Sequence, residues 1–94
     1  MQAFSLKNQV ALITGASKGI GFSIAEFFAE AGAKVVISSR DQAALDLLAQ
    51  ELRAKGYEAT GIACHVGKMD QLAHLVSATI ATYGQIDILV NNAA

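Results

Sequence analysis

The sequence predicts an α/β protein in which four parallel strands alternate with three helices. Short, nearly continuous apolar runs recur along the chain, and between them lie longer segments whose apolar residues repeat at helical spacing. Strands separated by helix-length segments are joined by crossovers and therefore run parallel. The chain has 94 residues, of which 53% are hydrophobic. That length suffices for one small domain, and the apolar excess indicates elements buried on more than one side.

Two strands and two helices are expected in the first part of the chain. Residues 9–14 (QVALIT) form an apolar run that stops at Gly15, as is typical of a strand buried on both faces. Helical periodicity follows over 19–32, a β-branched run over 34–39, and a second helical pattern over 41–56. The inward face expected for the first helix is Ile20, Ile24, Phe27, Phe28 and Ala31. The inward face expected for the second is Ala44, Leu45, Leu48 and Leu52.

The pattern continues to the end of the chain. Residues 58–64 predict a third strand, weakened by Gly61, before a helix over 68–84 and a fourth strand over 86–90. The inward face expected for this third helix is Leu72, Leu75, Val76, Thr79 and Ile80. Right-handed crossovers place the first two helices on one face of the sheet. If the chain reverses direction after the third strand, the order is 3-2-1-4 and the third helix covers the opposite face. Periodicity alone does not force that reversal.

Composition argues against several classes of function. The net charge of −1 comes with no basic stripe that would suit nucleic acid. The first residues lack the layout of a signal peptide and no apolar run reaches membrane-spanning length, so we expect no membrane association. Cys64 is the only cysteine, which rules out a disulfide within the chain and fits a reducing, cytoplasmic location. We expect a single unit over residues 1–94, with no second domain.

A cluster of glycines marks the end of the first strand. The segment 14–21 (TGASKGIG) contains Gly15, Gly19 and Gly21 between a predicted strand and a predicted helix. Glycine there permits a tight turn, lets a phosphate reach the backbone, and lets helix and strand pack closely. Backbone amides around Ile20 and Gly21 would then hold a pyrophosphate at the helix N-terminus. The alternative is a glycine-rich turn without a ligand, and the surrounding strand–turn–helix context favours nucleotide binding.

The glycine spacing points to one family. It is G-x-x-x-G-x-G, which differs from the usual G-x-G-x-x-G dinucleotide fingerprint and from a Walker A loop. With NNAA at residues 91–94, after the fourth strand, it resembles the short-chain dehydrogenase/reductase family, in particular its carbonyl and 3-oxoacyl reductases. The resemblance runs over residues 8–94. It implies a Rossmann-type, doubly wound parallel sheet truncated to four strands in the order 3-2-1-4 with three helices, so that residues 1–94 would be a partial dinucleotide-binding domain.

The resemblance also implies roles for the two motifs. In that family Gly15, Gly19 and Gly21 would line the pyrophosphate, and Ser17 belongs to the same loop. The segment that contains Asn91, Asn92 and Ala93 would stabilise the central sheet and border the adenosine and nicotinamide side of the cofactor. The family's usual final glycine is Ala94 here.

The end of the second strand predicts which dinucleotide binds. Folds that prefer NAD usually carry an acidic residue about 20 residues beyond the glycines, where it binds the ribose hydroxyls. This chain has Ser39 and then Arg40, and a guanidinium would hold a 2′-phosphate. Lys18 adds a second positive charge, and family members that use NADP(H) carry basic residues at both places. The sequence therefore favours NADP(H) over NAD(H), although each residue could also be a solvated surface charge. We interpret Asp41 as the N-cap of the second helix.

His65 and Val66 stand where the family often has Asp-Val, whose carboxylate faces the adenine amino group. An imidazole could accept that hydrogen bond as one neutral tautomer, could stack on the base, or could have no role, and these alternatives stay open. CHVGK, residues 64–68, resembles NADP-dependent carbonyl and retinal reductases of the family. Cys64 is expected in the core rather than as a nucleophile, and His74 is expected on the surface.

The family's catalytic residues are a Ser and a Tyr-x-x-x-Lys pair. Tyr57 and Tyr83 are followed four residues later by Gly61 and Asp87, so neither begins that motif. We therefore expect no catalytic residue in this chain and interpret it as part of a longer, homo-oligomeric reductase that transfers hydride between NADPH and a carbonyl or alcohol substrate. Alone it should self-associate. A stand-alone, non-catalytic nucleotide-binding or interaction module is the alternative. Substrate identity stays open.

Overall fold

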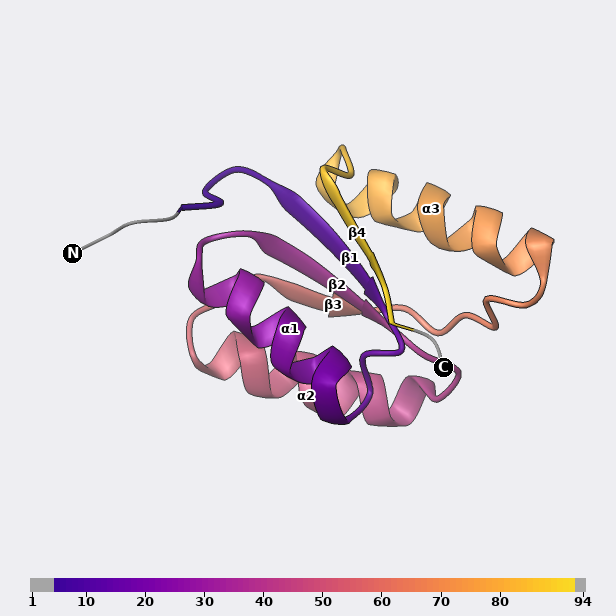
Figure 1. The fold of residues 1–94 in the computed structure, drawn as a ribbon, viewed down its shortest axis with the longest axis horizontal. Helices are drawn as coiled ribbons and strands as arrows, with labels where there is room; N and C mark the ends of the chain where they lie inside the picture. The colour runs from indigo at the N-terminus through magenta and orange to yellow at the C-terminus, as the bar shows by residue number, and fades with distance from the viewer. Residues whose placement is uncertain (1–4, 93–94) are drawn as a thin grey trace.

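The computed structural model describes residues 5–92 and contains one parallel sheet with helices on both faces. The elements are β1 (Val10–Thr14), α1 (Gly19–Glu30), β2 (Lys34–Ser38), α2 (Gln42–Ala54), β3 (Ala59–Gly61), α3 (Met69–Tyr83) and β4 (Ile88–Asn91). The strand order is β3-β2-β1-β4, and α1 and α2 cover one face while α3 covers the other (Figure 1). The predicted order and the reversal of direction after the third strand are confirmed.

The two central strands are apolar on both sides because each side belongs to a different core. Ala11 and Ile13 of β1 lie in register with Val35 and Ile37 of β2 and pack with α1 and α2. Leu12, between them, points to the other face, where it packs in a smaller cluster with Val36, Cys64 and Leu75. Strand residues alternate between faces, so a strand covered on both sides reads as a continuous apolar run.

The inward face of α1 differs from the prediction. Ile20 and Phe27 are 73% and 56% exposed, and the buried stripe consists instead of Gly21, Ala25 and Ala29. Larger apolar residues pack along the margins of that stripe, namely Phe22, Ile24, Phe28 and Ala31. The predicted helical spacing is confirmed, but the predicted inward face was built on the largest apolar residues of the helix. Small residues let the helix backbone approach the sheet closely, which explains why they occupy its centre.

The other two helices follow the prediction more closely. On α2, Leu45 and Leu52 are buried and Ala44 and Leu48 are half-buried, as expected. The predicted N-cap of α2 is confirmed, because the Asp41 carboxylate accepts a hydrogen bond from the amide of Ala44 at 3.2 Å. His74 is exposed, as predicted.

The inward face predicted for α3 is only partly correct. Leu75 and Thr79 are buried, but Val76 and Ile80 are 38% and 47% exposed. No second helix among the described residues lies beside α3 on this face, so its flank stays open (Figure 1). Leu89 of β4 is in register with Leu12, hence on the same face, and is 64% exposed.

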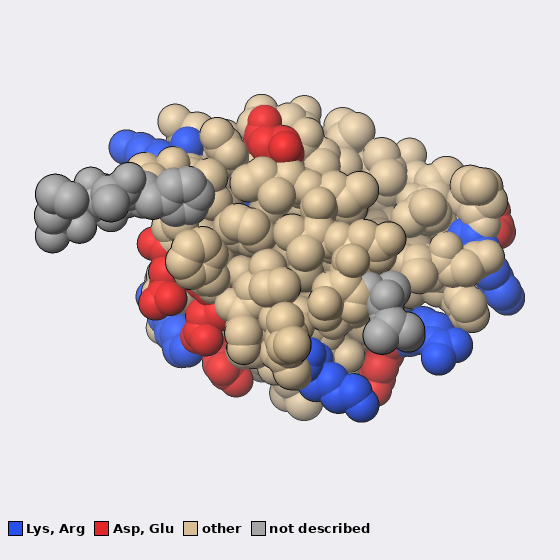
Figure 2. Space-filling view, viewed as in Figure 1, with Lys and Arg blue, Asp and Glu red and all other residues tan. Residues whose placement is uncertain are grey.

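The two edges of the sheet differ in what covers their outer backbone groups. β3 pairs with β2, and the residues that flank β3 extend the pairing, through the carbonyl of Glu58 and the amide of Ile62. Side chains of α2 bind backbone groups of Ala59 and Gly61 in β3 and of Ala63 just after it. Arg53 donates to the carbonyl oxygen of Ala59 at 2.7 Å, and the Gln42 amide bridges the carbonyl of Gly61 at 2.9 Å and the amide of Ala63 at 2.8 Å. β4, at the opposite edge, lies nearest the viewer in Figure 1, and uncharged residues cover the middle of that view in Figure 2.

The open edge predicts that the isolated 94-residue chain self-associates through β4 and the exposed flank of α3. Unpaired apolar edges invite pairing with another chain. Replacing Leu89 with lysine should weaken the association about tenfold or more, the range for losing burial of one leucine side chain. Leu47→Lys, on the exposed side of α2, is a matched control and should leave it unchanged. Sedimentation velocity measures both, and a monodisperse wild-type monomer with one sharp unfolding transition would contradict the prediction.

Candidate nucleotide-binding site

A cavity of about 760 Å³ lies at the carboxyl ends of the parallel strands. Its walls come from the loop between β1 and α1, the loop between β2 and α2, the segment after β3, and the end of β4. It is lined by Gly15, Ser17, Lys18, Ser38, Ser39, Arg40, Asp41, Ala44, Cys64, His65, Val66 and Asn92. The volume and position suit a small organic ligand, because open α/β sheets bind ligands beyond the carboxyl ends of the strands where the chain direction reverses.

Backbone hydrogen bonds continue past the strands and fix these walls. The amide of Ala16 donates to the carbonyl oxygen of Ser38 at 3.0 Å, and the amide of Cys64 donates to that of Ser39 at 2.7 Å. The buried Ser38 hydroxyl donates to the carbonyl oxygen of Ile62 at 2.6 Å. The three loops are thereby joined to one another where the sheet itself ends.

The glycine loop directs the start of α1 toward this region. Gly19, the first residue of α1, has a φ of +62°, which side chains disfavour, and a Cβ there would meet nothing within 4 Å. Among the described residues no side chain caps the helix at Lys18, and the first turn of the helix holds no acidic residue. The amides at the start of a helix have no partner within the helix and attract anions. This turn can therefore accept a phosphate group.

Gly21 has a different role, which is packing. A Cβ on Gly21 would lie 2.1 Å from the carbonyl oxygen of Gly15 and 2.8 Å from the side-chain amide of Asn92. The Gly15 oxygen is a backbone atom, so it cannot move aside for a side chain without moving the turn itself. The third glycine of the motif thus holds α1 against the turn that precedes it.

Asn91, the last residue of β4, and Asn92, just after it, tie that strand to β1 and the glycine loop. The Thr14 hydroxyl donates to the side-chain oxygen of Asn91 at 3.0 Å and accepts from the backbone amide of Asn92 at 3.2 Å. The Asn92 side chain donates to the carbonyl oxygen of Gly15 at 3.4 Å. Asn92 lines the cavity, and Asn91 supports it from the strand.

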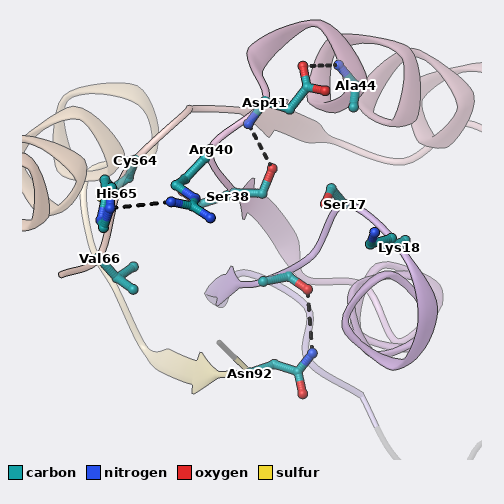
Figure 3. Close-up of a pocket in the computed structure, with 12 residues that line it drawn as sticks. Ser17, Lys18, Ser38, Arg40, Asp41, Ala44, Cys64, His65, Val66 and Asn92 are labelled. Atoms are coloured by element: carbon teal, nitrogen blue, oxygen red, sulfur yellow. Dashed lines mark hydrogen bonds between the residues drawn. The ribbon is translucent and has the colours of Figure 1, made fainter. Parts of the chain in front are cut away.

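Positively charged side chains reach the cavity from two loops, and in the view of Figure 3 Ser17 lies between them. Lys18 and Arg40 both line it, from different loops, and Nη1 of Arg40 lies 3.4 Å from Nε2 of His65. The Ser39 hydroxyl accepts from the amide of Asp41 at 3.3 Å. The Asp41 carboxylate is used as the cap of α2, where it accepts from the amide of Ala44.

Most of the predicted site residues come together. Eight of them line the cavity, namely Gly15, Ser17, Lys18, Ser39, Arg40, His65, Val66 and Asn92. Gly19, Ile20, Gly21 and Asn91 lie beside it without lining it, and Ala93 is outside the described residues. Four lining residues were not predicted as site residues: Ser38 and Ala44, which were missed, Asp41, which was predicted as a helix cap, and Cys64, which was predicted as core. The only signal for Ser38 was its place at the strand's end, and for Ala44 its place in the first turn of α2.

Cys64 is buried, as predicted, and also lines the cavity. Burial raises the pKa of its thiol above the ordinary value, so the thiol stays protonated and poorly nucleophilic. Among residues 5–92 no group of acidic, histidine and cysteine side chains could hold a metal ion. No helix in that range is long and apolar enough to cross a bilayer.

Nearly the whole chain matches a known family. The family model described as short chain dehydrogenase covers residues 9–94. The chain belongs to the short-chain dehydrogenase family. Short-chain dehydrogenase/reductase SDRA of Arabidopsis thaliana is 47% identical over 89 residues, which are 95% of this chain and 35% of that protein. Dehydrogenase/reductase SDR family member 4 of Homo sapiens is also 47% identical over 89 residues, 32% of its length. The chain thus spans about a third of these curated relatives.

Solved short-chain dehydrogenase structures share the fold. A metagenomic short-chain oxidoreductase in complex with NADP is 42% identical with a TM-score of 0.89, over 95% of this chain and 40% of that one. A hydroxysteroid dehydrogenase from Escherichia coli is 39% identical with a TM-score of 0.93, over 96% of this chain and 38% of that one. The Rossmann-type sheet predicted from the motifs is the fold of this family member.

The contact at Gly21 predicts that even one added methyl group destabilises the short-chain dehydrogenase fold. Gly21→Ala should lower the free energy of unfolding by about 1–3 kcal/mol, since α1 must move away from the turn. Ser23→Ala, on the exposed side of the same helix, is the matched control and should change little. Thermal unfolding of the full-length protein measures both. Equal midpoints for Gly21→Ala and wild type would show that α1 does not depend on this approach.

Proposed function

We propose that residues 1–94 form the NADP(H)-binding part of a longer reductase that transfers hydride between NADPH and a carbonyl or alcohol substrate. The observation that carries the proposal is the cavity itself. It is lined by two cations, Lys18 and Arg40, and by Ser39 where an NAD-binding fold usually has a carboxylate, and the uncapped start of α1 lies beside it.

Each part of the cavity suits one part of such a cofactor. The start of α1 would hold the pyrophosphate, and the glycine at position 19 leaves room for it. Arg40 and Lys18 would hold the 2′-phosphate, and His65 and Val66 would border the adenine. Asn92 would support the side on which the nicotinamide is expected. When bound, the nicotinamide supplies the hydride, and the residues described here bind and orient it.

Two solved relatives support the choice of cofactor. The metagenomic oxidoreductase is in complex with NADP, and an actinorhodin polyketide ketoreductase, 41% identical with a TM-score of 0.88, was solved with NADPH. Both resemble this chain over more than nine-tenths of its length. A guanidinium binds a phosphate through charge-assisted hydrogen bonds, which are stronger than neutral ones.

The remaining functional groups would come from outside residues 1–94. The family's Ser and Tyr-x-x-x-Lys pair would activate the carbonyl, and neither Tyr57 nor Tyr83 begins that motif. We extend the proposal to a homo-oligomeric, cytoplasmic reductase of small-molecule carbonyl compounds, in keeping with the sequence-based expectations.

The proposed cofactor preference predicts a selective loss on removing Arg40. In the full-length protein, Arg40→Ala should weaken NADPH binding about 10- to 150-fold, from about 1.5–3 kcal/mol for a charged hydrogen bond, and leave NADH binding nearly unchanged. Arg53→Ala removes the same charge from the far end of α2 and should affect neither cofactor. Fluorescence titration with both cofactors measures the losses, and an equal loss for NADH and NADPH would disprove the role assigned to Arg40.

The proposal also predicts that the 94-residue chain alone does not catalyse. Purified, it should show no carbonyl-dependent oxidation of NADPH, whereas the full-length protein should. Absorbance at the reduced nicotinamide band measures the reaction. Turnover that copurifies with the short chain and disappears in its Gly19→Val variant would overturn the prediction, because valine would fill the phosphate-binding turn.

A further inference from the structure

The chain that leads from β3 into the cavity is held by two glutamine side chains that the proposed function does not use. β3 ends at Gly61, and the segment after it reaches the cavity at Cys64, His65 and Val66. Figure 3 shows these three residues on one side of the pocket, across from Lys18. Residues 63–66 are called the β3 wall below. Because the strand has ended, other groups must fix the course of this wall.

Three consecutive amides of the β3 wall donate to three different elements. The amide of Ala63 donates to the side-chain oxygen of Gln42 on α2 at 2.8 Å. The amide of Cys64 donates to a backbone carbonyl of the loop between β2 and α2 at 2.7 Å. The amide of His65 donates to the side-chain oxygen of Gln71 on α3 at 2.8 Å. Since α2 and α3 lie on opposite faces of the sheet, the two glutamines hold the wall from both sides (Figure 1).

The Gln42 carboxamide bonds the chain as one residue of a neighbouring strand would. Its nitrogen donates to the carbonyl oxygen of Gly61 at 2.9 Å, while its oxygen accepts from the amide of Ala63. A residue of a parallel strand likewise bonds a carbonyl and the amide two residues later. The second N–H of the carboxamide donates to the Asp46 carboxylate on α2 at 2.7 Å. Both N–H donors are therefore used, which fixes the carboxamide with its oxygen toward the wall.

A close approach of α2 to β3 brings Gln42 within reach of the strand. A Cβ on Gly61 would lie 2.8 Å from the Cβ of Leu45 and 3.1 Å from its carbonyl oxygen. Leu45 is fully buried and stands three residues after Gln42 on the same helix. A larger residue at position 61 would push the helix away and break the contact of the carboxamide with the backbone. The glycine that weakens the sequence signal for β3 therefore allows α2 to hold the wall.

We propose that Gln42 and Gln71 are positioning residues that order the β3 wall before the adenine of the dinucleotide binds against it. The inference rests on the proposed function, in which His65 and Val66 border the adenine. A wall that is ordered in advance reduces the conformational entropy lost on binding. NADP(H) and NAD(H) share the adenine, so both lose affinity when the wall loosens. The glutamines differ in this respect from Arg40, which is assigned to the 2′-phosphate alone.

Two other contacts join the same helices to β3 nearer its amino end, and they supply matched controls. Arg53 of α2 donates to the carbonyl oxygen of Ala59 at 2.7 Å. The Tyr83 hydroxyl of α3 lies 2.9 Å from the hydroxyl of Thr60. Removing either contact weakens the attachment of a helix to β3 and leaves the bonds of the wall in place. These controls separate the positioning of the wall from a general stabilisation of β3.

The test compares the full-length wild type with Gln42→Met and Gln71→Met, and with the controls Arg53→Met and Tyr83→Phe. Methionine keeps the length of glutamine without its amide group and adds no charge to the cavity. Hydrogen–deuterium exchange of the protein without ligand measures the order of residues 63–65. Isothermal titration calorimetry measures the affinities for NADPH and NADH, and thermal unfolding measures the stability of every variant.

Each glutamine variant should speed exchange in the β3 wall about 2- to 10-fold, the range for one hydrogen bond. It should weaken the binding of NADPH and of NADH by a similar factor, equal for the two cofactors. Arg53→Met and Tyr83→Phe should leave the exchange of the wall and both affinities unchanged, even where they lower the unfolding temperature.

Unchanged exchange in either glutamine variant would overturn its role, because the wall would then be ordered without that side chain. Faster exchange with no loss of affinity would show that the adenine does not bind against the wall. Losses of the same size in the controls would reduce the role to general stability, and a loss confined to NADPH would transfer the effect to Arg40. If the wild type binds neither cofactor, the proposed function is wrong, and the exchange measurement still decides whether the glutamines order the wall.

Discussion

The close approach of α1 to the sheet is the constraint on which the site depends. Its contact stripe is Gly21, Ala25 and Ala29, so the helix backbone lies nearly against β1 and the turn at Gly15. That approach fixes where the helix begins and where its first amides point. A bulkier stripe would lift the helix away and carry the phosphate-binding turn with it. The same residues thus belong to the core and orient the helix, so that the positive end of its dipole faces the cavity.

Around this helix start, the cavity combines rigid walls with adjustable charges. Bonds from Ala16 to Ser38 and from Cys64 to Ser39 join the loops, and Thr14 at the end of β1 bonds the two asparagines at the end of β4. Lys18 and Arg40, by contrast, present charge at the ends of long side chains. A framework of this kind sets the location of a ligand by backbone geometry and leaves its discrimination to a few side chains, so the choice between cofactors can change without rebuilding the fold.

Sequence reasoning predicted those features that depend on local signals. Apolar runs, helical spacing and the capping aspartate at Asp41 each act over a few residues, and they gave the elements, the α2 face and its N-cap. The strand order needed the glycine and asparagine motifs, because periodicity does not show where the chain reverses. The α1 face was wrong because hydrophobicity favours large residues, whereas close packing favoured small ones. The contact of Arg40 with His65 joins residues 25 apart along the chain, and only the register of parallel strands brings them together.

The two edges of the sheet differ in how readily they can pair with a further strand. Two side chains of α2, Gln42 at its start and Arg53 near its end, bind the carbonyls of Ala59 and Gly61 on β3 and the amide of Ala63 just after it. A strand arriving at that side would have to displace both of them. β4 offers a backbone edge at which pairing meets no such competition among the described residues. A further strand, from the same polypeptide or from another copy, can therefore pair with β4 more readily than with β3. The β3 edge, whose outer backbone groups are bonded by α2, is the closed end of the sheet.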